Sequence, residues 1–311
     1  MDIRNIGRSG LRVSLVGLGC NNFGGRTGIN ESKAVIHAAL DAGITLFDTA
    51  DIYGNRGGSE IALGQWLGVR RKDIVLASKF GMAMDESGEK IGGARRYIMQ
   101  AVEDSLRRLK TDWLDLYQLH RPDPRTPIDE TLRALDDLIR AGKVRYIGCS
   151  NLPAWQVVDA QATAQMKGLE AFICAQDEYS LLLRTPEAEL IPALQAKGMG
   201  LLPFYPLAGG MLTGKYKREA PAPAGTRFAD AKLASRYLHD ANWRKVEKLQ
   251  AFCAARGKTL LELAFSWLAA QAVVPSIIAG ATRPEQIAQN ISAASWKLTA
   301  DELAEIDQIT R

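Results

Sequence analysis

Four residues of the types needed for carbonyl chemistry follow short apolar runs of this sequence: Asp48, Tyr53, Lys79 and His120. A tyrosine hydroxyl has an ordinary pKa of about 10, so it becomes a usable acid near neutral pH only if neighbours stabilise its anion. We expect Lys79 to lower the cost of that anion and Asp48 to keep Lys79 charged and oriented. His120 would hydrogen-bond the substrate oxygen.

The chemistry that this set suits is reduction of an aldehyde or ketone. When a hydride adds to a carbonyl, negative charge develops on the oxygen, and Tyr53 could both meet that charge and pass a proton to it. No side chain of the set can supply a hydride, so the sequence implies a nicotinamide cofactor. A metal site is not expected, because the three histidines show no paired-ligand spacing.

Each residue taken alone has an ordinary structural interpretation. Lys79 could be a solvated charge at the end of a strand, Asp48 a turn former, and Tyr53 a packing residue with a satisfied hydroxyl. His120 is the only one of the three histidines that we place at a strand end. The functional interpretation therefore depends on all four residues meeting at one site.

The chain must position these residues through eight short apolar segments that alternate with helical patterns. The segments are residues 15–20, 46–50, 74–79, 114–120, 144–150, 172–176, 200–205 and 276–279. This alternation predicts a parallel sheet, and eight such units in 311 residues predict an α/β fold of the (β/α)8 TIM barrel type. The structural alternative is a doubly wound sheet, but Gly17-Leu18-Gly19 lacks the third glycine of its fingerprint.

We expect one domain over residues 1–311, opened by a β-hairpin within residues 1–14. The connection at residues 206–241 is long and rich in glycine and proline. Such a loop either folds over a ligand or is a flexible insertion, and its cations Lys215 and Arg227 favour a segment that holds an anion.

Composition and charge exclude several classes of protein. The net charge is +4 and is spread along the chain, so no nucleic-acid partner is expected. No apolar run reaches the roughly 20 residues of a membrane span, and the first residues do not resemble a signal peptide. The four cysteines include no CxxC pair, which is consistent with a reducing cytoplasm. The oligomeric state is left open.

Several motifs together resemble the aldo-keto reductase superfamily. They lie at residues 47–54, 77–81, 115–123, 142–151 and 207–216, and the resemblance spans residues 1–311. It implies a (β/α)8 barrel with an N-terminal hairpin and a catalytic tetrad of Asp48, Tyr53, Lys79 and His120. The long connection and the Leu-Thr-Gly-Lys-Tyr motif are more similar to the branch with bacterial general reductases and potassium-channel β subunits than to the sugar and steroid reductases.

The resemblance also implies a set of cofactor-binding residues. Ser150, Asn151 and Gln176 would hold the nicotinamide carboxamide, and the ring would stack on Phe204, where relatives often carry Tyr or Trp. The remaining implied contacts are Gly19, Cys20, Asn21, Pro206, Leu207, Ala208, Gly210, Lys215, Arg227, Gly280, Thr282, Arg283, Gln286 and Asn290.

The segment 280–290 resembles the site of the adenosine 2′-phosphate, so NADPH is favoured over NADH. Gln286 replaces an arginine of some relatives, and a plain helix cap at Thr282 explains the segment almost as well without the family.

The rival to an enzyme is a nicotinamide-binding regulatory or redox-sensing module. An isomerising barrel enzyme would leave Gln176 and Phe204 unexplained. The sequence does not identify the carbonyl substrate: Arg121 could favour an acidic one, although a salt bridge with Asp123 is the expectation.

Overall fold

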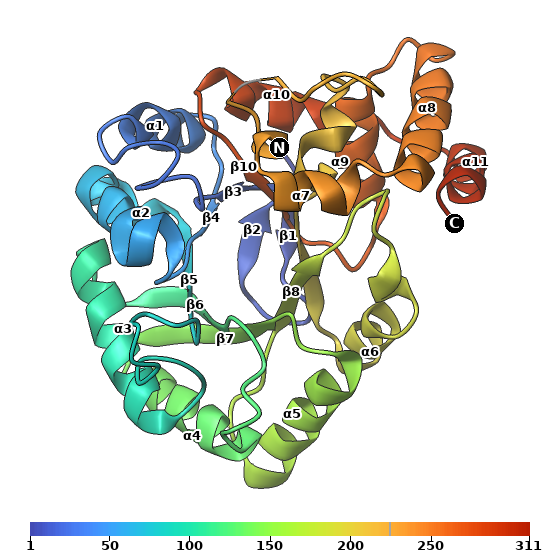
Figure 1. Ribbon diagram of the computed structural model, residues 1–311. Coiled ribbons are helices and arrows are strands. Elements are labelled where there is room, and N and C mark those ends of the chain that lie inside the picture. The colour runs from blue at the N-terminus through green and yellow to red at the C-terminus, as the bar shows by residue number, and fades with distance from the viewer. Residues whose placement is uncertain (224) are drawn as a thin grey trace.

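The computed structural model describes residues 1–223 and 225–311. Eight parallel strands form a nearly closed barrel inside a ring of helices (Figure 1). The strands are β3 (Val16–Gly19), β4 (Leu46–Asp48), β5 (Val75–Phe80), β6 (Leu114–Leu119), β7 (Val144–Ser150), β8 (Cys174–Glu178), β9 (Gly200–Phe204) and β10 (Ile277–Gly280). The predicted fold is confirmed, with strand bounds that differ from those expected by at most two residues.

The sheet order is β10-β3-β4-β5-β6-β7-β8-β9, so consecutive strands are neighbours. The two ends of this order also meet, because the backbone N–H of Leu201 on β9 donates to the carbonyl of Val273 just before β10 (2.8 Å). Because the eight strands are parallel, their carboxyl ends all lie at one rim of the barrel. Functional groups gather at this rim in barrels of this type.

The predicted hairpin is present as β1 (Ile3–Asn5) paired with β2 (Arg12–Ser14). Ile6 and Val13 of this hairpin are fully buried against residues inside the barrel, among them Leu46, Leu116 and Leu202. The backbone N–H of Arg8 donates to the carbonyl of Gly198, just before β9 begins (2.8 Å). The hairpin thus closes the N-terminal end of the barrel and leaves the C-terminal end as the open rim.

Helices cover the outside of the barrel, and one large apolar cluster fills the space between them and the strands. The helices are α1 (Ser32–Asp41), α2 (Tyr53–Trp66), α3 (Arg95–Leu109), α4 (Ile128–Arg140), α5 (Ala154–Lys167), α6 (Leu190–Lys197), α8 (Asp240–Ala254), α9 (Leu260–Ala270), α10 (Glu285–Ala293) and α11 (Ala300–Thr310). Short 3₁₀ helices occur at η1 (Gly68–Asp73) and η2 (Thr185–Glu187). Across the described residues, no helix combines the length and apolarity needed to cross a bilayer.

The connection at 206–241, called the belt below, is more ordered than a glycine-rich loop suggests. It contains η3 (Ala208–Thr213), η4 (Arg227–Ala229) and the short helix α7 (Ala231–Tyr237). Its aromatic residues Tyr216, Phe228 and Tyr237 are buried and pack ring against ring. Ala224 lies outside the described residues. The belt is therefore held by a small core of its own, which glycine and proline content does not reveal.

The turn after β4 has an unusual backbone that positions Tyr53. Residues 54–57 all have positive φ angles, and at Gly54 a Cβ would lie 2.3 Å from the carbonyl oxygen of Phe23. Only glycine has no Cβ, so Gly54 is the residue that permits this close approach. These four residues separate Tyr53 from the regular helical part of α2.

A buried polar cluster lies behind that turn. Tyr97 donates to Asp51 (3.2 Å), while Ser78 on β5 and Arg108 on α3 donate to the two oxygens of Glu60 (2.5 and 2.7 Å). Asp51 Oδ1 is buried without a hydrogen-bond partner among the described residues. Burial, reinforced by the neighbouring Glu60 carboxylate, raises the pKa of Asp51 to about 8.

This shift predicts a pH dependence of stability. Between about pH 4 and pH 8 the folded chain keeps a proton on Asp51 that the unfolded chain has lost, so its contribution to the free energy of unfolding falls as pH rises, by at most about 1.4 kcal/mol per pH unit. Asp51→Asn should remove this slope in urea melts across that range, while Asp159→Asn, at an exposed site on α5, should keep it. An unchanged slope in Asp51→Asn would contradict the assignment.

Candidate active site

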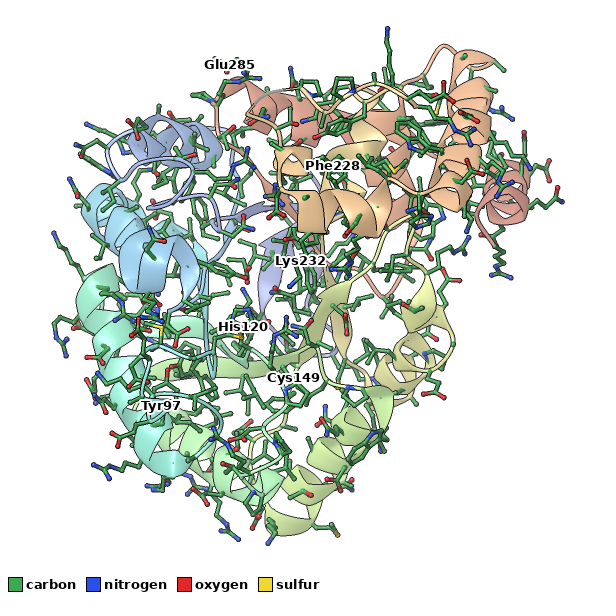
Figure 2. The ribbon with its side chains drawn as sticks, viewed as in Figure 1. Tyr97, His120, Cys149, Phe228, Lys232 and Glu285 are labelled. Carbon is green, nitrogen blue, oxygen red and sulfur yellow. The ribbon has the colours of Figure 1, made fainter. Side chains whose placement is uncertain are left out.

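A cleft of about 880 Å³ opens at the rim formed by the strand ends. Its lining comes from the ends of β3, β4, β6, β7, β8, β9 and β10, from the belt, and from the segment that leads into α10. Figure 2 shows His120 near the middle of the barrel opening, with Phe228 of the belt and Glu285 of α10 to one side of it.

The four predicted catalytic residues are brought together at this rim. The ammonium of Lys79 is completely buried and lies 2.6 Å from Asp48 Oδ2, 2.9 Å from the carbonyl of Thr49 and 3.5 Å from the Tyr53 hydroxyl. The rings of Tyr53 and His120 lie edge to face with centroids 5.6 Å apart. Asp48, Tyr53 and His120 line the cleft, whereas Lys79 lies behind them.

The second oxygen of Asp48 is held by two glutamines. Gln176 Nε2 lies 2.9 Å and Gln118 Nε2 3.3 Å from Asp48 Oδ1. Gln176 was expected only as a cofactor contact, and Gln118 had no predicted role. Gln118 could have been found from the alternation of side chains along a strand, because it stands two residues before His120 and so shares its face.

Burial and charge act against each other at Tyr53. Burial raises the pKa of Tyr53 above its ordinary value, and the nearby Lys79 ammonium offsets only part of that rise. Lys79 thus acts in the expected direction, easing ionisation of Tyr53, while desolvation outweighs its single charge. The Tyr53 hydroxyl is therefore protonated at neutral pH.

His120 is an uncharged donor or acceptor rather than an acid. Burial, then the positive charges of Lys79 and Arg121, lower the pKa of His120 to about 2. Its backbone carbonyl accepts from the side-chain amide of Asn151 (3.1 Å), and its Nδ1 is buried without a partner among the described residues. At neutral pH the imidazole can hydrogen-bond a substrate oxygen without carrying charge.

Most of the residues assigned to a cofactor line the same cleft. They are Gly19, Cys20, Asn21, Ser150, Asn151, Gln176, Phe204, Pro206, Leu207, Gly210, Lys215, Arg227, Gly280, Thr282, Arg283 and Gln286. Two assigned residues are not among the lining. Ala208 is fully buried in the apolar core, and Asn290 lies on the buried side of α10.

Two cations of the belt stand in the cleft without an acidic partner. No carboxylate oxygen of the described residues lies within 4 Å of Lys215 or Arg227. Arg227 instead reaches the side-chain oxygens of Asn21 and Asn22 (3.5 and 3.4 Å) and lies over the ring of Tyr205. Lys215 is exposed, whereas Arg227 is half-buried. Because a half-buried guanidinium with neutral partners is poorly compensated, this part of the cleft suits an anion such as a diphosphate.

The belt is attached to the barrel at points that the sequence did not indicate. Glu178, buried at the end of β8, accepts from Arg236 and from the hydroxyl of Tyr237, both on α7. On the other side, Arg26 donates to the carbonyl of Gly225 (2.9 Å). The belt therefore crosses the cleft and is fixed on both sides of it.

At the entrance to α10, the side chain of Gln286 folds back on the turn before it. Its Oε1 accepts from the backbone N–H of Thr282 (2.8 Å), from the Thr282 hydroxyl (3.2 Å) and from the backbone N–H of Arg283 (3.2 Å). Three donors thus converge on one oxygen at the start of a helix, an arrangement that also suits a phosphate oxygen. The residues present are consistent with a phosphorylated dinucleotide lying from here to Tyr53.

Comparisons with known proteins agree with this geometry. The model of the aldo/keto reductase family matches residues 15–311. A probable voltage-gated potassium channel subunit beta of Oryza sativa subsp. japonica is 39% identical, covering 94% of this chain and 91% of its own length. The uncharacterized oxidoreductase YrpG of Bacillus subtilis (strain 168) is 38% identical, covering 99% and 96%. The L-glyceraldehyde 3-phosphate reductase of Escherichia coli (strain K12) is 32% identical, covering 99% and 92%.

The family match extends over almost the whole chain, and the relatives cover more than nine-tenths of it. The strand order and the residues at the strand ends are those that the motifs predicted. The chain therefore belongs to the aldo/keto reductase family of oxidoreductases.

Proposed function

We propose that the protein is an NADPH-dependent reductase that converts an aldehyde or ketone to an alcohol, with Tyr53 as the proton donor. The observation that carries this proposal is the buried ion pair of Lys79 and Asp48 directly beside the Tyr53 hydroxyl. A buried lysine is costly, and here its ammonium lies beside the Tyr53 hydroxyl, which lines the cleft next to the neutral His120.

In this proposal Tyr53 and His120 both approach the carbonyl oxygen of the substrate. His120 hydrogen-bonds that oxygen and orients the carbonyl, and Tyr53 donates its proton as negative charge develops there. Lys79 stabilises the phenolate that remains, because a cation 3.5 Å from the hydroxyl oxygen favours the ionised form. Bound NADPH would supply the hydride.

The remaining cleft residues would hold the cofactor. We propose that Ser150, Asn151 and Gln176 bind the carboxamide, Phe204 stacks on the ring, and Lys215 and Arg227 bind the diphosphate. Thr282, Arg283 and Gln286 would bind the 2′-phosphate. Gln286 would then give up its hydrogen bonds with Thr282 and Arg283 to the incoming phosphate. Asn290, which does not line the cleft, would reach the adenine only if α10 shifts.

The alternative is a nicotinamide-binding regulatory module with little turnover, which the similarity to a probable potassium channel subunit beta favours. The two candidates share the cofactor site and differ in turnover.

We further propose that the chain acts as one barrel domain in the cytoplasm, where its four cysteines, all free and buried, would stay reduced.

The direct test is an assay of the purified protein with NADPH and a panel of aldehydes and ketones. NADPH fluorescence should change on binding, and absorbance at the nicotinamide band should fall when a substrate is added. Binding without oxidation of NADPH by any carbonyl would favour the regulatory module. Neither binding nor oxidation would exclude both candidates.

Removal of the Tyr53 hydroxyl should abolish turnover and spare the cofactor. We expect Tyr53→Phe to lower kcat by roughly 10²- to 10⁴-fold, the usual contribution of a positioned acid, with NADPH affinity changed only slightly. Tyr146→Phe, at the opposite end of the barrel, is the matched control and should have normal kcat. Near-normal kcat in Tyr53→Phe would reassign the proton donor to His120.

Arg283 should distinguish the two nicotinamide cofactors. Loss of a charge-assisted hydrogen bond is worth roughly 1.5–3 kcal/mol, so Arg283→Ala should weaken NADPH binding by about tenfold or more and leave NADH binding almost unchanged. Fluorescence titration with each cofactor gives the two affinities. Lys297→Ala, an exposed cation far from the cleft lining, is the control. Equal losses for both cofactors would show that Arg283 does not contact the 2′-phosphate.

A further inference from the structure

Arg121 is a cation of the cleft that the proposed reaction does not use. It directly follows His120 beyond the end of β6, it lines the cleft, and its residue is exposed to solvent. Its charge is close enough to His120 to contribute to lowering the pKa of that histidine. Arg121 therefore lines the same cleft as Tyr53 and His120.

The acidic partner expected for Arg121 is already occupied. Asp123 Oδ2 accepts from the backbone N–H of Gly93 and the hydroxyl of Thr126 (both 2.8 Å), and its Oδ1 accepts from the backbone N–H of Arg125 (3.0 Å). The Arg125 side chain is the one that pairs with Asp123 (3.5 Å). The expected salt bridge between Arg121 and Asp123 is wrong, because Asp123 is taken up by donors of its own loop and of the connection before α3.

No other carboxylate replaces Asp123. Among residues 1–223 and 225–311, no carboxylate oxygen lies within 4 Å of the Arg121 guanidinium. Asp177 also lines the cleft, and the charge of Arg121 offsets part of the rise that burial causes in the pKa of Asp177. Asp177 Oδ1 accepts from the backbone N–H of Glu178 (2.7 Å). The carboxylate of Glu178 forms an ion pair with Arg236.

The sheet order separates Arg121 from the proposed cofactor phosphates. In the order β10-β3-β4-β5-β6-β7-β8-β9 around the barrel, β6 lies four strands from β10 and therefore across the opening from it. The cations proposed for the phosphates are on the belt and before α10, on the side where Phe228 and Glu285 lie in Figure 2. Arg121 is thus on the side of the cleft left for the substrate.

We propose that Arg121 selects carbonyl substrates that carry an anionic group, a carboxylate or a phosphate, on the part of the molecule away from the carbonyl. This rests on the proposed carbonyl reduction and adds its substrate class. The planar guanidinium offers two parallel donors that match both kinds of anion. The anion is bound equally before and during reaction, so its contribution is to KM more than to kcat.

The test compares substrates that differ only in charge. The first pair is 4-formylbenzoate and its neutral methyl ester, and the second is glyceraldehyde 3-phosphate and glyceraldehyde. With NADPH, the wild-type protein should show a higher kcat/KM for the anion of at least one pair, and the pair that shows it distinguishes a carboxylate from a phosphate. Arg121→Gln should reduce that preference about tenfold, chiefly through KM.

Two variants serve as controls. Arg121→Lys keeps the charge and should retain part of the preference, while Arg125→Gln removes a neighbouring guanidinium that does not line the cleft and should retain all of it. The preference should also weaken between 0.05 and 0.5 M salt, at roughly constant kcat, because an exposed charge is screened. An equal preference in Arg121→Gln and wild type, or equal kcat/KM for anion and neutral partner in wild type, would overturn the proposal.

A binding measurement separates this proposal from the proposed function. In the presence of NADP⁺, 4-(hydroxymethyl)benzoate should raise the melting temperature of the wild-type protein, and benzyl alcohol at the same concentration should not. Arg121→Gln should lose that increase. If the neutral aldehydes are reduced and the anion shows no Arg121-dependent binding, carbonyl reduction stands and the substrate class is wrong. If no aldehyde is reduced, carbonyl reduction fails, and the melting temperatures alone decide whether Arg121 binds anions.

Discussion

The site depends on one buried ion pair, Lys79 with Asp48. A lysine ammonium removed from water costs several kcal/mol unless its donors are satisfied, and here Asp48, the Thr49 carbonyl and the Tyr53 hydroxyl surround it. Asp48 is in turn held by Gln118 and Gln176. The five side chains come from β4, the turn that follows it, β5, β6 and β8, so the ion pair is satisfied only when half of the barrel is assembled in register.

The same burial determines the charge states of the groups beside the pair. Desolvation raises the pKa of Tyr53 in spite of Lys79, and it lowers the pKa of His120 with help from Lys79 and Arg121. One group is thus a protonated phenol and the other an uncharged imidazole at neutral pH. The proposed reaction does not need a strongly acidic Tyr53, because Lys79 stabilises the phenolate relative to the same site without that charge.

The cleft is completed by segments far apart in the chain. The aromatic residues of the belt pack against one another. Its helix α7 donates hydrogen bonds to Glu178 at the end of β8, and its Gly225 carbonyl accepts one from Arg26 of the loop after β3. Glycines let this segment follow a path close to other atoms: at Gly209, with φ of +68°, a Cβ would lie 2.9 Å from Phe228. The belt thereby presents Lys215 and Arg227 toward the cleft, and its described residues give neither of them an acidic partner.

Much of this arrangement was determined by the sequence itself. Eight apolar segments alternating with helical patterns specify a parallel barrel, and parallel strands bring Asp48, Lys79 and His120 to one rim whatever the details of packing. Only the tertiary structure decided how buried each group is, and hence the direction of its pKa shift. It also decided which side chains satisfy Asp48, how the belt is fastened through Glu178 and Arg26, and that Asp123 turns away from Arg121, because these depend on contacts between residues distant in sequence.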